Sequence, residues 1–177
     1  MNSSVQDPRY PVGKFQLPET FTTEDRDNAI RTLAELPTEM RNAFEGLSTA
    51  QINTPYREGG WMLRQVVHHV ADSHMNAFIR FRLALTEDWP TIKPYKQDAW
   101  AVLHDVSAPV EWSLQIIESV HARWVMLLQS MDEGQWQRGF VHPENGKMGL
   151  EQAVRLYAWH SQHHLAHITH LRARDKW

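Results

Sequence analysis

The segment Tyr157–His170 restricts the possible folds of this chain more than any other segment. It holds five histidines between positions 160 and 170 and contains neither proline nor glycine, so it predicts an uninterrupted helix. Residues three, four and seven positions apart share a helix face, which places His160, His164 and His167 together. The same face carries apolar and aromatic residues, namely Ala153, Leu156, Tyr157 and Leu171. The three imidazoles therefore occupy the stripe that a helix normally buries.

Three imidazoles on an inward-facing stripe need a chemical reason. A buried imidazole must be hydrogen-bonded, paired with a charge or bound to a metal, because an unsatisfied buried polar group costs roughly 1–3 kcal/mol. One such residue is usually a hydrogen-bonded core histidine, whereas three together favour a metal site. We therefore expect metal ligation on this face, with a hydrogen-bonded cluster as the alternative. His68, His163 and His170 are expected to be solvated or at the edge of the fold.

The residue composition excludes several kinds of protein. The chain has 177 residues and no cysteine, which rules out disulfides, thiolate metal sites and cysteine nucleophiles and leaves His, Asp and Glu as ligands. Its formal net charge is −3 and it has no basic run, so nucleic acid is not the expected partner. No apolar run approaches the roughly 20 residues of a membrane span, and the N-terminus lacks the features of a signal peptide. We expect a cytoplasmic protein with a small-molecule substrate and no membrane partner.

Apolar periodicity predicts an all-α fold, a four-helix bundle formed by a single domain over residues 1–177. The expected helices span about 22–47, 61–85, 107–133 and 150–174. Residues 1–20 contain three prolines and predict an extended N-terminal arm, and Pro37 is expected to kink or interrupt the first helix. The turn-rich segment 139–149 allows a short hairpin. Residues 86–106 form a long connection between helices two and three, so this segment either has a function or crosses the bundle.

Helical spacing predicts two ligands but does not select a third. His160 and His164 lie one turn apart, and imidazoles at that spacing can reach one metal ion. Residue 161 is serine rather than glutamate, so the metalloprotease pattern with a helical glutamate does not apply. A third ligand should come from another helix, because bundles build metal sites from facing helices. The candidates are His68, His69 and His74 on the second helix and His121 on the third, and position on the helix slightly favours His74.

Five segments carry a resemblance to a known family, namely Thr54–Asn76, Ile79–Glu87, Pro90–Tyr95, His121–Trp124 and Tyr157–Ile168. They are similar to the YfiT group within the DinB-like superfamily. In that superfamily the first metal ligand precedes an aliphatic-Ala-Asp step, and here this residue is His69. The other two ligands come from a W-H-x-x-x-H pattern, here His160 and His164. The resemblance implies a four-helix bundle of the DinB type, one bound divalent metal ion and a homodimer.

The resemblance also implies an activity. Proteins of this group are usually called metal-dependent hydrolases, and some relatives use the three-histidine site to activate a low-molecular-weight thiol such as bacillithiol for transfer. Three neutral histidine ligands leave an open coordination position, which is typical of catalytic rather than structural zinc. A water there would have its pKa lowered towards 7, and a thiol would lose its proton. We expect a hydrolase, with a thiol S-transferase and a non-catalytic metal- or ligand-binding bundle as alternatives.

The metal and the supporting residues follow from the same reasoning. Zinc (Zn2+) is expected on availability, and nickel (Ni2+) is the alternative because imidazole sites bind it well. Asp72 lies one turn after His69 and is either an acceptor that orients an imidazole or takes a proton, or a surface carboxylate paired with Arg64 or Arg80. The remaining candidates for the pocket are His167, His121 and Tyr157. The aromatic residues Trp61, Trp124, Tyr157 and Trp159 are expected to pack in the core, with a place in the wall of the substrate pocket as the alternative for one of them.

Overall fold

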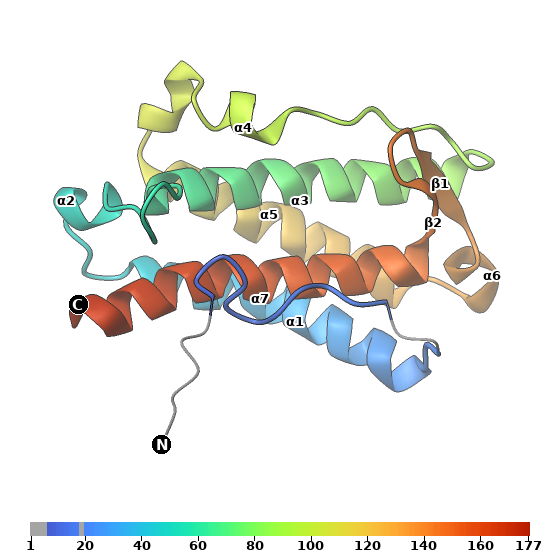
Figure 1. Ribbon diagram of the computed structural model, residues 1–177. Coiled ribbons are helices and arrows are strands. Elements are labelled where there is room, and N and C mark those ends of the chain that lie inside the picture. The colour runs from blue at the N-terminus through green and yellow to red at the C-terminus, as the bar shows by residue number, and fades with distance from the viewer. Residues whose placement is uncertain (1–6, 18–19) are drawn as a thin grey trace.

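Four long helices form the body of the protein in the computed structural model, which describes residues 7–17 and 20–177. They are α1 (Thr23–Phe44), α3 (Leu63–Thr86), α5 (Val110–Gln129) and α7 (Leu150–Asp175) (Figure 1). The shorter elements are α2 (Thr49–Ile52), α4 (Gln97–Trp100), the 3-10 helix η1 (His104–Ser107), α6 (Glu133–Trp136), β1 (Gly139–His142) and β2 (Gly146–Gly149). The predicted four-helix bundle is therefore confirmed.

The order of the helices around the bundle explains the long connection after α3. Both α1 and α3 pack against α5 and α7, so α1 and α3 lie on one diagonal of the bundle and α5 and α7 on the other. Figure 1 shows that α3 and α5 run in the same direction, opposite to α1 and α7. Two parallel neighbours need a connection that returns along the whole bundle. Residues 87–109, which include α4 and η1, make this return along the outside of α3 (Figure 1).

Helix α1 begins where the sequence predicts but is not interrupted at its proline. The hydroxyl of Thr22 accepts a hydrogen bond from the backbone N–H of Asp25, and the Asp25 carboxylate accepts one from the N–H of Thr22. This reciprocal pair is a capping box, which satisfies two N–H groups that a helix start leaves free. Pro37 lies inside α1, and the helix continues to Phe44. Because proline has no N–H, the carbonyl of Leu33 loses its usual partner within the helix.

The predicted hairpin is present and holds the start of the long connection. Strands β1 and β2 pair antiparallel, with Gly139 opposite Gly149. The N–H of Ile92 donates to the carbonyl of Val141 at 3.0 Å, and the N–H of Val141 donates to the carbonyl of Pro90 at 2.9 Å. Gly139 faces the ring of Trp89 so closely that an added Cβ would lie 2.7 Å from a ring carbon, so the packing requires glycine here.

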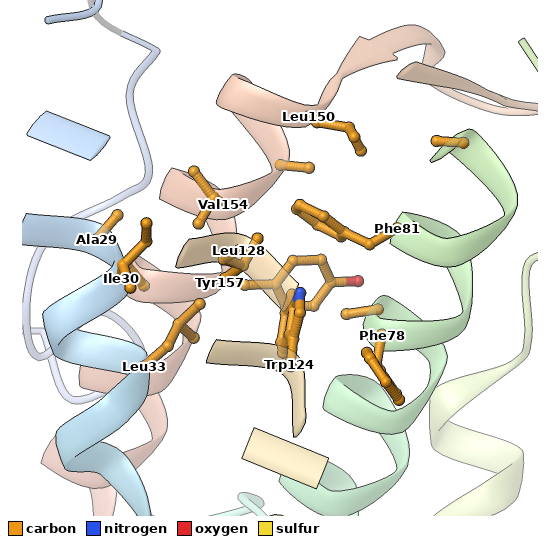
Figure 2. Packing of buried hydrophobic residues seen from close by; sticks show 14 of the residues in the cluster. Ala29, Ile30, Leu33, Phe78, Phe81, Trp124, Leu128, Leu150, Val154 and Tyr157 are labelled. Carbon is orange, nitrogen blue, oxygen red and sulfur yellow. The ribbon is translucent and has the colours of Figure 1, made fainter. Parts of the chain in front are cut away.

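The buried core is divided into two apolar clusters with a layer of histidines between them. The first cluster contains Leu33, Phe81, Trp124 and Val154 among others, and Figure 2 shows how their side chains meet between the four helices. The second contains residues from the opposite ends of the same helices, including Met40, Val66, Ile117 and Leu171. On α3, α5 and α7, the residues that fall between the two clusters include His74, His121, His160, His163, His164 and His167. The tertiary structure thus gathers histidines from three helices at one level.

The described part of the N-terminal arm lies against α7. The indole Nε1 of Trp159 donates a hydrogen bond to the carbonyl of Gly13 at 3.2 Å, and the ring of Phe15 lies 5.8 Å from that of Trp159. The rest of the predicted arm includes residues 1–6 and 18–19, which lie outside the described residues. None of the helices in the described ranges combines the length and apolar character that crossing a membrane requires.

Candidate metal centre

The three histidines that the resemblance predicts as ligands meet between α3 and α7. One nitrogen from each of His69, His160 and His164 lies within 4.8 Å of the others. The Nε2 atoms of His69 and His160 are 3.2 Å apart. Two imidazole nitrogens bound 2.0–2.1 Å from a tetrahedral zinc ion would be about 3.3 Å apart. The spacing therefore fits two ligands of one ion, and the neighbouring helices α3 and α7 produce it without a loop.

A second histidine group overlaps the first on α7. His163, His164 and His167 also offer nitrogens within 4.8 Å of one another, so His164 belongs to both groups. The ring of His163 stacks on Trp159 at 4.6 Å, and that of His167 stacks on Tyr56 at 3.9 Å.

His163 is expected from the sequence to be solvated or at the edge of the fold, but the structure buries it. Only 8% of its surface is exposed, because Trp159 and the N-terminal arm around Tyr10 lie over it. His68 is half-buried with its Nδ1 2.7 Å from the hydroxyl of Ser113, while His170 is exposed as predicted.

A pocket of about 440 Å³ contains both histidine groups in its wall. The remaining wall includes Arg57 and Trp61 from the segment before α3, Gln97 and Asp98 from α4, and Trp159 from α7. Trp61 and Trp159, both expected in the core, line this pocket, and Trp61 also packs against the second apolar cluster. Sequence reasoning did not find Arg57, Gln97 or Asp98, because irregular segments carry no periodicity that would show which way a side chain points.

His74 is not one of the three histidines of the metal group, but it contacts one of them, His160. Its Nε2 lies 3.0 Å from Nδ1 of His160, and its Nδ1 lies 2.8 Å from Nε2 of His121. Nδ1 of His121 lies 2.6 Å from the carbonyl oxygen of Leu33 on α1. Of the three predicted pocket residues, only His167 lines the pocket; His121 lies in this row and Tyr157 accepts a hydrogen bond from Arg80 at 3.2 Å.

Burial keeps the histidines of the site neutral. It lowers the pKa of His69 to about 4, with a smaller effect from the nearby His163. Burial, followed by the neighbouring histidines, also places the pKa of His160 and of His164 well below the usual value. A neutral imidazole has a free lone pair, so three such groups fit a divalent metal of borderline softness. Nδ1 of His164 and Nδ1 of His163 are both buried with no hydrogen-bond partner among the described residues, a condition that fits metal ligation in either histidine group.

Asp72 makes neither of the contacts considered for it. Its side chain lines a neighbouring cavity beneath the long connection, whose wall also contains His69, and burial followed by the charge of Asp105 raises its pKa to about 6. Arg64 donates instead to the Asn53 side chain and the Val106 carbonyl, and Arg80 donates to Tyr157. Within the described ranges, no histidine of the metal group hydrogen-bonds to the Asp72 carboxylate.

Comparison with known proteins identifies the family. The sequence model of the DinB superfamily matches residues 32–168. The chain belongs to the DinB superfamily. A protein of Bacillus mycoides (strain KBAB4) and one of Bacillus cereus (strain 03BB102), each named "Putative metal-dependent hydrolase", are 51% identical to this DinB-superfamily chain over 173 residues. The alignments cover 98% of this chain and 100% of each relative.

A solved structure supports the same assignment. YfiT from Bacillus subtilis, described as a probable metal-dependent hydrolase with an unusual four-helix bundle topology, superimposes with a TM-score of 0.93 and 45% identity. The match covers 96% of this DinB-superfamily chain and 98% of YfiT. The predicted resemblance is confirmed.

Proposed function

We propose that this DinB-superfamily protein is a metal-dependent hydrolase that acts on a small molecule, with His69, His160 and His164 holding one divalent metal ion. The observation that carries the proposal is the convergence of three neutral imidazoles, from two helices, on the wall of one pocket. The names of its relatives support the same class of enzyme.

The overlapping group of His163, His164 and His167 is the less suitable site. Burial lowers the pKa of His167 to about 3, and the positive charge of Arg57 contributes to this effect. The same charge opposes a cation bound beside His167. The ring faces of His163 and His167 also pack on aromatic side chains, which favours a role in the pocket wall.

The residues of the pocket determine what such a site can do. A divalent ion held by three neutral imidazoles would activate a bound water or thiol for nucleophilic attack. His69, His160 and His164 carry no negative charge that would weaken this effect, and three protein ligands would leave a bound ion with an open coordination position. Arg57, Gln97 and Asp98 line the same pocket and would supply polar contacts for a substrate. Zinc is the proposed metal, with nickel second.

Metal analysis of protein purified without a tag or a nickel column tests the site directly. We expect about one divalent ion per chain in the wild type and its loss in His160→Ala and His164→Ala. His167→Ala and His170→Ala serve as controls and should retain the metal. Occupancy that survives in His160→Ala and His164→Ala, or that disappears in His167→Ala, would show that the ligands are assigned wrongly.

The reaction is tested by turnover with and without a thiol. Ester and amide substrates test hydrolysis, and an electrophile together with bacillithiol or glutathione tests the thiol S-transferase alternative. Hydrolysis that is unaffected by thiol is the expected result. Activity that requires thiol would replace the hydrolase by the transferase, since the same three ligands serve both reactions.

A non-catalytic metal-binding bundle makes a different prediction. If the metal only fastened α3 to α7, chelation would lower the melting temperature strongly and no activity would depend on the ion. We expect chelation to abolish activity while the bundle stays folded at room temperature. The homodimer and the cytoplasmic location expected from the sequence stay predictions.

A further inference from the structure

A row of three histidines connects the backbone of α1 to the metal group. It runs from the carbonyl of Leu33 through His121 and His74 to His160, with contacts of 2.6, 2.8 and 3.0 Å. We propose that this row fixes the tautomer of His160, so that the lone pair of its Nε2 faces the metal. His74 and His121 are then positioning residues for the ligand His160 and do not bind the metal themselves. The role of His160 as a ligand rests on the proposed function.

The row begins at a carbonyl group that Pro37 leaves free. In an α-helix the N–H of residue 37 would donate to the carbonyl of Leu33, four positions earlier, and proline has no N–H. Helix α1 nevertheless continues through Pro37, so the Leu33 carbonyl points into the bundle without its helical partner. Nδ1 of His121, on the neighbouring α5, lies 2.6 Å from this oxygen. A proline that would otherwise weaken α1 thereby provides a fixed hydrogen-bond acceptor.

The direction of every hydrogen bond in the row follows from this acceptor. A carbonyl oxygen can only accept, so Nδ1 of His121 must carry the proton. A neutral imidazole has one donor and one acceptor, so Nε2 of His121 accepts from Nδ1–H of His74. By the same rule Nε2 of His74 accepts from Nδ1–H of His160. Nε2 of His160 is then left with a lone pair, 3.2 Å from Nε2 of His69.

The opposite direction is excluded at the buried end of the row. It would place the lone pair of His121 Nδ1 against the Leu33 oxygen at 2.6 Å, so that two acceptors would face each other. His74 is 0% exposed and His121 is 1% exposed, and both lie between the two apolar clusters. Water therefore has little access to satisfy the reversed arrangement. A proton on Nε2 of His160 would also occupy the position where a metal binds.

The tautomers can be read in the metal-free protein by long-range 1H–15N correlation NMR of the histidine rings. We expect the Nδ1–H tautomer at His121, His74 and His160, with Nε2 of His160 accepting from His69. An Nε2–H tautomer at His74 or His160 would overturn the proposal. Because this measurement needs neither metal nor substrate, its outcome is separate from that of the proposed hydrolase activity.

Substitution at His121 tests whether the effect reaches the ligand through two hydrogen bonds. His121→Leu removes the acceptor for Nδ1–H of His74, so we expect metal affinity, measured by competition with a chromophoric chelator, to fall about 10–100-fold. His121→Gln can accept from His74 and donate to Leu33, so it should recover most of the affinity. Equal affinity in His121→Leu and wild type, or equal losses in the two variants, would contradict the proposal.

Ile117→Ala is the matched control for a general loss of packing. Ile117 is fully buried one turn before His121 on α5, and its apolar side chain cannot hydrogen-bond to a histidine of the row. We expect a lower melting temperature and unchanged metal affinity, with circular dichroism confirming that all three variants are folded. A loss of affinity in Ile117→Ala as large as in His121→Leu would assign the effect to packing and overturn the proposal.

Discussion

Burial makes the histidines of this protein suitable as ligands rather than as cations. A solvated histidine with a pKa near 6.5 is partly protonated near neutral pH and then has no lone pair for a metal. Burial lowers the pKa of both His69 and His121 to about 4. This arrangement makes the metal-free protein less stable at acidic pH, because the histidines bind protons in the unfolded chain and not in the folded one.

The metal-free protein should therefore lose stability as the pH falls from about 6.5 to about 4. In that window unfolded His69 and His121 bind protons and the folded residues do not, so the free energy of unfolding rises with pH. A fully expressed shift from 6.5 to about 4 corresponds to on the order of 3 kcal/mol per residue. Asp72 works in the opposite direction, because its folded pKa is raised to about 6, but it is only half-buried. Urea unfolding at pH 7.5 and pH 4.5 measures the difference.

The matched variant for this effect is His121→Gln, which keeps the hydrogen bonds and removes one titrating group. Its stability should depend less steeply on pH than that of the wild type. Stability that stays constant or increases towards pH 4.5 in the wild type would show that these histidines are not held neutral.

Tyr157 should contribute to stability and not to the metal site. Its hydroxyl accepts from Arg80, and its side chain belongs to the first apolar cluster (Figure 2). Tyr157→Phe removes the hydrogen bonds of this hydroxyl to Arg80 and Ser73, each of which is worth about 1 kcal/mol. We expect a small decrease in the melting temperature with unchanged metal occupancy and unchanged KM. A changed KM at normal metal occupancy would show that Tyr157 contributes to the substrate pocket.

Helix α3 is the element that organises the site. It carries His69 towards the pocket, His74 towards the histidine row and Gln65 towards the long connection. The side chain of Gln65 accepts from the N–H of Met62 at the start of the helix and donates to the carbonyl of Ala101 at 2.9 Å. The same residue therefore completes the N-terminus of α3 and holds the connection that supplies Gln97 and Asp98 to the pocket.

Gln65→Ala should loosen that connection without removing the metal. Losing the bond to Ala101 leaves residues 97–106 with fewer contacts to α3, so their amide hydrogens should exchange faster. We expect a loss of about 2 kcal/mol in stability from the two missing hydrogen bonds. Hydrogen–deuterium exchange measured by mass spectrometry checks the location of the effect. Gln115→Ala, on the exposed surface of α5, is the control, and equal exchange in both variants would argue against this role.

The folded protein exposes an apolar surface beside the long connection between α3 and α5. Trp112 and Leu103 are 60% and 53% exposed, and Trp100, Trp112 and Ile116 border one cavity there. Contiguous exposed apolar side chains are characteristic of surfaces that contact another protein. If the homodimer predicted from the resemblance forms, this surface is its expected interface.

Trp112→Glu should then convert a dimer into a monomer, because a charge in an apolar interface is not compensated. Sedimentation-equilibrium centrifugation measures the mass against 20.7 kDa for one chain. Leu17→Glu, at an exposed position on the N-terminal arm, is the control and should leave the mass unchanged. A wild-type monomer, or a dimer that survives Trp112→Glu, would contradict the expected interface.

Local periodicity was sufficient for the helices and for two of the three histidines of the metal group. The spans near α1, α3, α5 and α7 follow from apolar spacing, and His160 and His164 share a face because helix geometry relates residues four positions apart. The N-cap of α1 at Thr22 is also predictable from local sequence, because it depends on two residues three positions apart. The resemblance, rather than the spacing, selected His69. His69 and His74 both lie near the inward side of one helix, and a single helix cannot show which of them its neighbour meets.

Tertiary structure decided everything that depends on contacts between distant segments. His121 reaches the Leu33 carbonyl across 88 positions, and the consequence of Pro37 for the metal group becomes visible only when α1 and α5 pack together. The N-terminal arm buries His163, and the parallel course of α3 and α5 places Gln97 and Asp98 in the pocket. Sequence patterns record the preference of each helix for burial, whereas the pairing of two buried faces depends on how the whole chain packs. The sequence alone therefore determined a histidine-rich bundle, and the packing of its helices decided which histidines face the pocket and which hold the others in place.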